Sequence, residues 1–333
     1  MTSALLLDEN LTLRVAEWSA PEPVSGEAVL RVEYAGLCGS DLHAMGTGAW
    51  IEYWPAVLGH EVVGVVQEAA DASLVGRRVV VDSRIPCRAC PDCARAPRLC
   101  ANLTWLGESR PGGFASALVV PVTSLVPVPD SLDAAVAVLA EPLAVSMCAI
   151  DALPAGAESV LIQGYGPVGA LLHSEITRRN PACSVTVVEP QAARRDAATT
   201  FGAAVTDAPA DSGYDVVIDA AGYPDSVAHA LARVRRGGTV LLVGLGSTPL
   251  GMTSADIVEK AVTLIGSIGF DDDHLGRAVD ALAADPDRYA GLVSTRVPLS
   301  GFADFLTTSV LGASGHGAGR SPDALKVIVE CAT

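Results

Sequence analysis

Basic residues are scarce in this sequence, and lysine is almost absent. Its 333 residues include 22 Lys or Arg against 38 Asp or Glu, which gives a formal net charge of −16. Only Lys260 and Lys326 are lysines. This charge repels nucleic-acid phosphates and anionic lipid, and no basic stripe is present to neutralise them. We therefore expect no nucleic acid and no membrane among the partners of this protein.

We expect neither a leader segment nor a long apolar run in this sequence. Its start, MTSALLLDENLTLRV, holds a short apolar run with neither a basic segment before it nor a small-residue cleavage site after it. We expect no stretch that is both long and apolar enough to span a bilayer. These absences predict an untargeted, cytoplasmic protein. Half of the residues are hydrophobic, and the length fits two domains.

Two different secondary-structure patterns divide the chain. Residues 1–143 contain runs typical of strands, such as EAVLRVEYAG and EVVGVVQEA, which indicate a twisted sheet or partial barrel. Between 144 and 286, short apolar strands alternate with Ala-rich helices, and parallel neighbours need such crossovers. Residues 287–333 return to strand patterns and are expected to rejoin the first domain. The predicted class is α/β, a β-rich domain plus a doubly wound parallel sheet.

A glycine-rich turn marks a candidate dinucleotide site. The sequence GYGPVG follows the apolar run VLIQ and opens a helix. Alone it also fits an ordinary strand-to-helix turn, but here strand, turn, helix, next strand and an acidic residue follow in order. Gly164 permits the tight turn, Gly166 lets the pyrophosphate approach, and Gly169 allows close helix packing. The expected cofactor-binding residues are Gly164, Gly166, Pro167, Val168, Gly169, Glu189 and Arg194.

Glu189 is the acidic residue of that pattern. It ends the second strand of this domain, where its carboxylate would accept hydrogen bonds from the adenosine ribose and repel a 2′-phosphate. We therefore expect NAD to be preferred over NADP. Two alternatives stay open: Glu189 could be a solvated strand-end carboxylate, and Arg194 or Arg195 nearby could offset the repulsion.

Four of the eight cysteines are crowded into one segment, CRACPDCARAPRLC, within a lobe of about residues 84–103. Four thiolates complete a tetrahedral zinc shell and leave no open position, so such a site is structural. The alternatives are two local disulfides or free thiols. Without an export signal, metal binding is the favoured interpretation. The predicted ligands are Cys87, Cys90, Cys93 and Cys100.

A second set of metal-ligating side chains is dispersed along the chain. Cys38, His60, Glu61 and Glu141 combine a thiolate, an imidazole and two carboxylates, a set suited to zinc with one exchangeable position. Taken singly, each also fits a buried cysteine, a hydrogen-bonded histidine or an ordinary carboxylate. Their joint presence beside a dinucleotide domain favours a catalytic zinc.

These motifs resemble a known family. GLCGSDLH, GHE, the four-cysteine lobe, GGFAS, EPLAV and GYGPVG stand in the order found in zinc-dependent medium-chain alcohol and polyol dehydrogenases. The pattern is most similar to the sorbitol dehydrogenase branch, which includes cyclitol and aminocyclitol dehydrogenases. The resemblance implies a GroES-like catalytic domain (1–143 and 287–333), a Rossmann NAD-binding domain (144–286), and a homodimer or homotetramer formed through the Rossmann domains.

The resemblance also implies roles for the dispersed set. Cys38, His60 and Glu61 match the catalytic zinc ligands. Glu141 matches either a fourth ligand or the residue that holds the zinc-bound water. Its alternative role is to begin the following helix, where a carboxylate interacts favourably with the helix dipole.

Three further residues of GLCGSDLH match known positions of this family. Ser40 and His43 match a proton relay, and Asp41 matches the carboxylate that orients the zinc-binding histidine. The alternative for the relay is that Ser40 caps a local turn and His43 is merely exposed. Trp50, Tyr53 and Trp54 lie on a segment that could form a pocket wall or could serve only in packing.

The expected function is the reversible oxidation, with zinc and NAD, of a secondary alcohol of a polyol, cyclitol or aminocyclitol. The alternative is a simple alcohol dehydrogenase or aldehyde reductase with the same zinc apparatus. A non-catalytic nicotinamide-binding or structural protein is the third hypothesis. Gly269 stands where sorbitol dehydrogenases carry an arginine, so the resemblance does not extend to sorbitol as the substrate.

Overall fold

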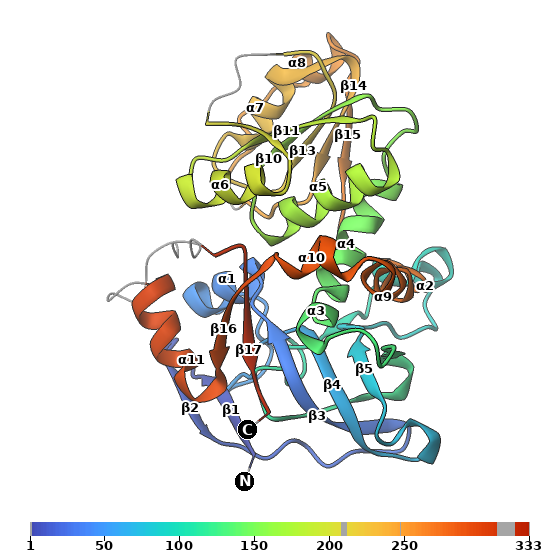
Figure 1. Ribbon diagram of the computed structural model, residues 1–333, viewed down its shortest axis with the longest axis vertical. Coiled ribbons are helices and arrows are strands. Elements are labelled where there is room, and N and C mark those ends of the chain that lie inside the picture. Colours follow the sequence, from blue (N-terminus) through green and yellow to red (C-terminus); the bar gives the residue numbers. More distant parts are fainter. Residues whose placement is uncertain (1, 208–211, 247, 312–323, 333) are drawn as a thin grey trace. The chain divides into compact units, whose positions relative to one another are not determined.

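The computed structural model describes residues 2–207, 212–246, 248–311 and 324–332, so part of the C-terminal segment lies outside the described residues. The chain forms two compact units, each with its own sheet (Figure 1). Unit 1 takes its described residues from Met1–Glu141, Asp271–Pro322 and Lys326–Thr333. Unit 2 takes its described residues from Pro142–Phe270 and Asp323–Leu325.

Unit 1 is built on a seven-stranded mixed sheet. Its order is β16-β17-β3-β4-β5-β9, with β8 also paired to β3. Only β16 and β17 run parallel to each other. The strands are β3 (Glu27–Gly36), β4 (Glu61–Ala69), β5 (Arg78–Val81), β8 (Ala117–Pro121), β9 (Leu125–Pro127), β16 (Val293–Pro298) and β17 (Lys326–Glu330).

β3 organises this sheet because it pairs with three neighbours. Ala28, Leu30 and Val32 alternate along it and are fully buried, as expected for a strand with one face on the core. At its end, Gly36 lies opposite Glu61 of β4 and opposite Ile328 of β17. The register therefore brings the end of β3, the start of β4 and the middle of β17 to one point.

The remaining elements of unit 1 are short. Helix α9, which the sequence analysis placed in the second domain, packs against α3 and α10 and belongs to unit 1. Two small sheets pair β1 (Ser3–Leu7) with β2 (Leu13–Glu17) and β6 (Arg84–Ile85) with β7 (Thr104–Trp105). The helices are α1 (Gly39–Thr47), α2 (Pro91–Arg95), α3 (Ala134–Ala137), α9 (His274–Ala284), α10 (Pro286–Ala290) and α11 (Leu299–Phe305).

Unit 2 contains a six-stranded parallel sheet of order β12-β11-β10-β13-β14-β15. Its central strand carries consecutive buried apolar residues, as a strand covered on both faces requires. The order confirms the predicted doubly wound sheet. The strands are β10 (Ser159–Gln163), β11 (Ser184–Val188), β12 (Ala204–Thr206), β13 (Tyr214–Asp219), β14 (Val234–Leu242) and β15 (Thr263–Gly266).

The helices of unit 2 include the one that opens at the glycine-rich turn. They are α5 (Pro167–Arg179), α6 (Ala192–Thr200), α7 (Ser226–Arg233) and α8 (Ser254–Val258). Helix α4 (Ala140–Asp151) begins in unit 1, and its residues from Pro142 onward belong to unit 2. Pro167 stands at the first position of α5, where its fixed φ suits a helix start and its missing N–H costs no hydrogen bond.

One helical stretch corrects an expectation from the sequence. Residues 134–151 are long and apolar enough to cross a membrane, with a mean hydropathy of 1.7. However, 78% of this stretch is buried inside the protein. Core helices meet the same length and composition criteria as membrane spans, and the burial identifies this one as a core helix.

Candidate metal and cofactor sites

Three of the predicted catalytic ligands meet in unit 1. Cys38 follows β3 and caps helix α1, His60 immediately precedes β4, and Glu61 begins that strand. One ligand atom from each lies within 4.8 Å of the others. A thiolate, an imidazole and a carboxylate at this spacing fit a zinc ion that keeps a position for substrate.

Asp41 contacts two of these ligands, Cys38 and His60, and holds them in place. Its Oδ2 accepts a hydrogen bond of 2.9 Å from the backbone N–H of Cys38, and its Oδ1 accepts one of 3.1 Å from Gly59. The same Oδ1 lies 3.5 Å from Nδ1 of His60. A carboxylate on one ring nitrogen directs the other nitrogen toward a metal, which is the role that the resemblance implied for Asp41.

Lys326 is a site residue that the sequence analysis missed. Its ammonium group forms an ion pair with Oε2 of Glu61, and both side chains are 1% exposed. It also donates a 3.0 Å hydrogen bond to the carbonyl of Leu37, the residue before Cys38. Gly36 makes room for this pair, since a Cβ there would lie 1.9 Å from Glu61 Oε2 and 2.9 Å from Lys326 Cε.

A signal for Lys326 was present in the sequence. It is one of two lysines, and three apolar residues follow it in the run KVIVE. A charged residue at the start of a buried strand needs a buried partner of opposite charge. What the sequence does not give is the partner, because Glu61 lies far away along the chain.

Glu141 is buried in unit 1, although it is not one of the three residues whose ligand atoms converge. Its Oε1 accepts a hydrogen bond of 2.9 Å from the hydroxyl of Ser83. Burial raises the pKa of Glu141 to about 7, an effect that the charge of His60 opposes and the charge of Glu61 reinforces. Glu141 also lies in the first turn of α4, so both interpretations from the sequence analysis remain compatible with its position.

The two predicted relay residues lie on helix α1. Ser40 is half-buried in the first turn, and Cys38, not Ser40, is the cap of this helix. His43 is exposed, with its ring centroid 4.8 Å from that of Trp50. The Tyr53 hydroxyl donates a hydrogen bond to the carbonyl of Val57 and accepts one from its backbone N–H, each at 3.1 Å. These are local structural contacts.

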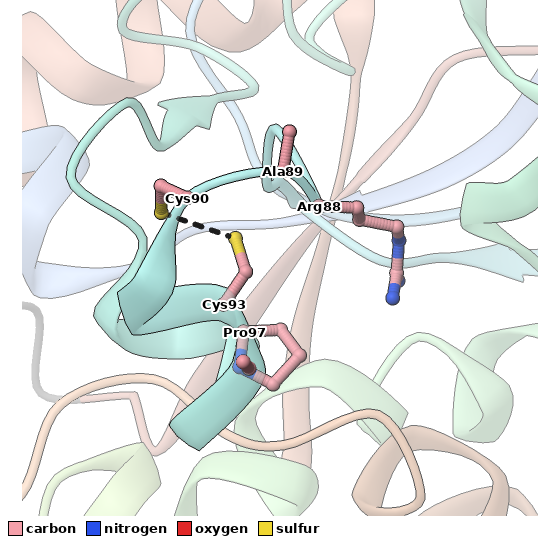
Figure 2. Close-up of a pocket in the computed structure, with 6 residues that line it drawn as sticks. Arg88, Ala89, Cys90, Cys93 and Pro97 are labelled. Atoms are coloured by element: carbon pink, nitrogen blue, oxygen red, sulfur yellow. Dashed lines mark hydrogen bonds between the residues drawn. The ribbon is translucent and has the colours of Figure 1, made fainter.

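The four-cysteine lobe has the geometry of a closed zinc site. A tetrahedron with Zn–S bonds of about 2.3 Å has sulfur–sulfur edges of about 3.8 Å, whereas a disulfide needs about 2.05 Å. Here all four cysteines are free, with sulfur–sulfur separations of 3.4, 3.5, 3.9 and 3.9 Å. Figure 2 shows the Cys90 and Cys93 sulfurs directed toward each other. The lobe therefore fits zinc and does not fit disulfides.

Local contacts favour the thiolate form of one cysteine of this lobe and fasten the lobe to the rest of unit 1. Backbone N–H groups, that of Ala89 first, lower the pKa of the Cys87 thiol to about 6, which favours the thiolate that zinc binds. Arg88 pairs with Asp272 at 2.9 Å, and Arg98 pairs with Asp271. The lobe is thus tied to the segment that leads into α9.

The glycine-rich turn of unit 2 is shaped as the motif requires. Gly164 has φ +94°, and an added Cβ would lie 2.8 Å from Cβ of Ala221. A Cβ on Gly169 would lie 2.2 Å from the Gly164 carbonyl oxygen, so α5 packs directly on the turn. At Gly166 the nearest atom to an added Cβ is Nη1 of Arg194, at 3.6 Å, and this leaves room for a phosphate.

Glu189 directly follows β11 and is only 3% exposed, which excludes the solvated alternative. Its carboxylate accepts hydrogen bonds of 2.8 Å from the backbone N–H of Tyr165 and 2.9 Å from that of Gln191. Arg195 donates to the Glu189 carbonyl at 2.9 Å. Arg194 is buried beside Gly166, so a carboxylate and a guanidinium both border the turn.

Comparisons with known proteins agree with this geometry. Residues 24–130 match the alcohol dehydrogenase GroES-like domain, and residues 175–284 match the zinc-binding dehydrogenase family. The chain is 32% identical over 267 residues to L-galactonate-5-dehydrogenase of Escherichia coli K12, covering 74% of this chain and 77% of that protein. The chain is a zinc-dependent medium-chain dehydrogenase.

Two further relatives support the assignment. D-altritol 5-dehydrogenase of Agrobacterium fabrum C58 is 33% identical, with 88% of this chain and 91% of that protein covered. The crystal structure of a putative zinc-binding dehydrogenase from Sinorhizobium meliloti 1021 bound to NADP is 28% identical, with a TM-score of 0.86 and 99% of each chain covered. The dehydrogenase therefore uses zinc and a nicotinamide dinucleotide, as the motifs predicted.

We expect Cys93→Ser to empty the lobe selectively. The zinc content should fall from about two ions per chain to about one, because a closed site needs all of its thiolates. The melting temperature should drop, while kcat of the protein that stays folded should change little. Zinc analysis and thermal unfolding measure both effects. A variant that kept both ions, or one that lost turnover with an unchanged melting temperature, would contradict this assignment.

We expect Lys326→Met to destabilise unit 1 strongly in the zinc-free protein, because there it leaves the buried carboxylate of Glu61 without a counter-charge. Breaking a buried ion pair from one side costs about 3–5 kcal/mol, which urea unfolding can measure. The double variant Glu61→Gln with Lys326→Met removes both charges and should regain most of that stability. If the double variant were as unstable as the single one, packing rather than charge would explain the loss.

Proposed function

We propose that this dehydrogenase oxidises a secondary alcohol of a polyol, cyclitol or aminocyclitol to the ketone, reversibly and with NAD as the preferred acceptor. The observation that carries the proposal is the convergence of Cys38, His60 and the buried Glu61 on one point of unit 1. The two relatives named as 5-dehydrogenases of a sugar acid and a sugar alcohol support the substrate class.

The proposed chemistry divides between the two groups that the protein binds. When bound, zinc would supply Lewis acidity at the alcohol oxygen, and the nicotinamide would supply a hydride acceptor. In unit 1, Cys38, His60 and Glu61 hold the metal, and Asp41 orients the imidazole. Proton removal falls to the hydroxyl of Ser40 and the exposed imidazole of His43.

Glu141 is proposed to act at the open face of the metal, as a ligand or as the holder of its water. Its burial and its bond to Ser83 fix the carboxylate within the electrostatic range of His60. A carboxyl group with a raised pKa in such a place is typical of a functional site.

Unit 2 is proposed to hold the dinucleotide, with the pyrophosphate on the turn Gly164–Gly169 and the adenosine ribose on Glu189. Because the carboxylate repels a 2′-phosphate, NAD is favoured, and Arg194 beside Gly166 moderates the preference. Unit 1 is then the catalytic domain.

A homodimer or homotetramer through unit 2, working in the cytoplasm, is also proposed. β15 is the edge strand of its sheet, with unpaired backbone groups on one side. Val258 and Ile268, on either side of this strand in the sequence, are 74% and 58% exposed. An edge strand with exposed apolar neighbours is suited to pairing with a second copy.

A substrate screen tests the function directly. Polyols, cyclitols, aminocyclitols and primary alcohols are each offered with NAD and with NADP, and reduced nicotinamide is followed by absorbance. We expect the highest kcat/KM for a secondary alcohol of a ring or chain polyol with NAD. Turnover confined to simple primary alcohols would favour the alternative, and equal kcat/KM with NADP would remove the role of Glu189.

We expect Glu141→Gln to lower kcat/KM by about 10²-fold or more, the scale at which catalytic acid–base and electrostatic groups contribute. NADH affinity should stay unchanged, because the dinucleotide binds other residues. Ser83→Ala is the matched control, since it removes the hydrogen bond but keeps the carboxylate, and its loss should be smaller. A Glu141→Gln protein with full turnover would assign Glu141 to the helix start alone.

A further inference from the structure

We propose that Tyr165 and His173 are positioning residues for the dinucleotide, which together hold the glycine-rich turn of unit 2 in its phosphate-binding shape. The proposal rests on the placement of the pyrophosphate on this turn. It adds two residues that no motif assigns, one at the variable position between Gly164 and Gly166 and one in the middle of α5.

The side chain of Tyr165 points into the protein rather than toward a ligand. It is 0% exposed, and its hydroxyl shares a 3.0 Å hydrogen bond with Nδ1 of His173, which is 3% exposed. The two ring centroids lie 5.9 Å apart. Burial raises the pKa of Tyr165, so the phenol stays protonated and available for this bond. The turn is therefore bonded to the interior of the helix that it opens.

A second contact holds the same residue from the other side. The backbone N–H of Tyr165 donates 2.8 Å to Oε2 of Glu189. Gly164, next to it, donates 2.8 Å from its backbone N–H to the carbonyl of Val188. The middle of the turn is thus fixed between β11 and α5, with Glu189 contacting the turn as well as the proposed ribose position.

This double hold has a consequence for binding. Helix N-terminal amides bind a phosphate best when they already point at it, because ordering a loop on binding costs conformational entropy. The glycines at 164 and 166 give the turn freedom that most residues lack, and Gly166 has an open side. The Tyr165–His173 bond removes that freedom without occupying the phosphate space.

The test is the affinity for NADH, measured by fluorescence titration of the zinc-loaded protein without substrate. Tyr165→Phe should raise the dissociation constant about 3- to 10-fold, the scale of one buried hydrogen bond. His173→Phe should have a similar effect, and the double variant should lose no more than either single variant. Adenosine monophosphate, which lacks the second phosphate, should be affected much less than NADH.

Tyr223 offers a matched control in the same unit. Its hydroxyl makes the same 3.0 Å bond to Nδ1 of a histidine, His229, but the ring is 39% exposed and lies outside the glycine-rich turn. Tyr223→Phe should leave NADH affinity unchanged. If Tyr165→Phe also left it unchanged, or weakened NADH and adenosine monophosphate equally, the positioning role would be overturned.

Gly166→Val separates this proposal from the placement on which it rests. A side chain at this position fills the phosphate space, so NADH binding should be lost. If Gly166→Val bound NADH normally, the placement of the pyrophosphate would be wrong and the positioning role would fail with it. If Gly166→Val lost binding while Tyr165→Phe kept it, only the positioning role would fail.

Discussion

One buried ion pair, between Lys326 and Glu61, fixes the point at which three strands of unit 1 meet. Two charges with 1% exposure each are tolerable only together, so β17 and β4 must each keep its register with β3, which lies between them. Gly36 between them cannot gain a side chain. Cys38 and His60 are each within two residues of this point along the chain, and their convergence therefore depends on it.

Unit 2 also contains a buried carboxylate. Glu189 is buried as deeply as a core residue, and its carboxylate is stabilised by two backbone N–H groups rather than by a lysine. The two units thus stabilise a buried carboxylate at a proposed binding site in two different ways. In unit 1, the ammonium group of Lys326 on a strand far away in the sequence stabilises the Glu61 carboxylate. In unit 2, backbone N–H groups of Tyr165 and Gln191 stabilise the Glu189 carboxylate, and the carboxylate in turn holds the glycine-rich turn in place.

Local motifs were readable from the sequence, and distant contacts were not. The glycine spacing of GYGPVG and the crowding of four cysteines each report a constraint within a few residues, so the doubly wound sheet and the closed lobe geometry could be predicted. The Lys326–Glu61 pair and the Tyr165–His173 bond depend on tertiary packing, which one sequence does not encode in its spacing. The largely apolar stretch 134–151 shows that a local pattern can also mislead. Its length and hydropathy fit a membrane span, and only its burial in the structure identifies a core helix.

The four-cysteine lobe is tied by Arg88 to Asp272 and by Arg98 to Asp271, so zinc bound in the lobe as predicted would link the stability of unit 1 to metal supply. A ligand that binds only the folded form stabilises it by RT ln(1 + [L]/Kd), so each tenfold rise in free zinc above the dissociation constant adds about 1.4 kcal/mol. Two ion pairs connect that lobe to the segment just before α9. With zinc in this lobe, the folded fraction of the protein would therefore rise with the free zinc concentration, whether or not substrate is present.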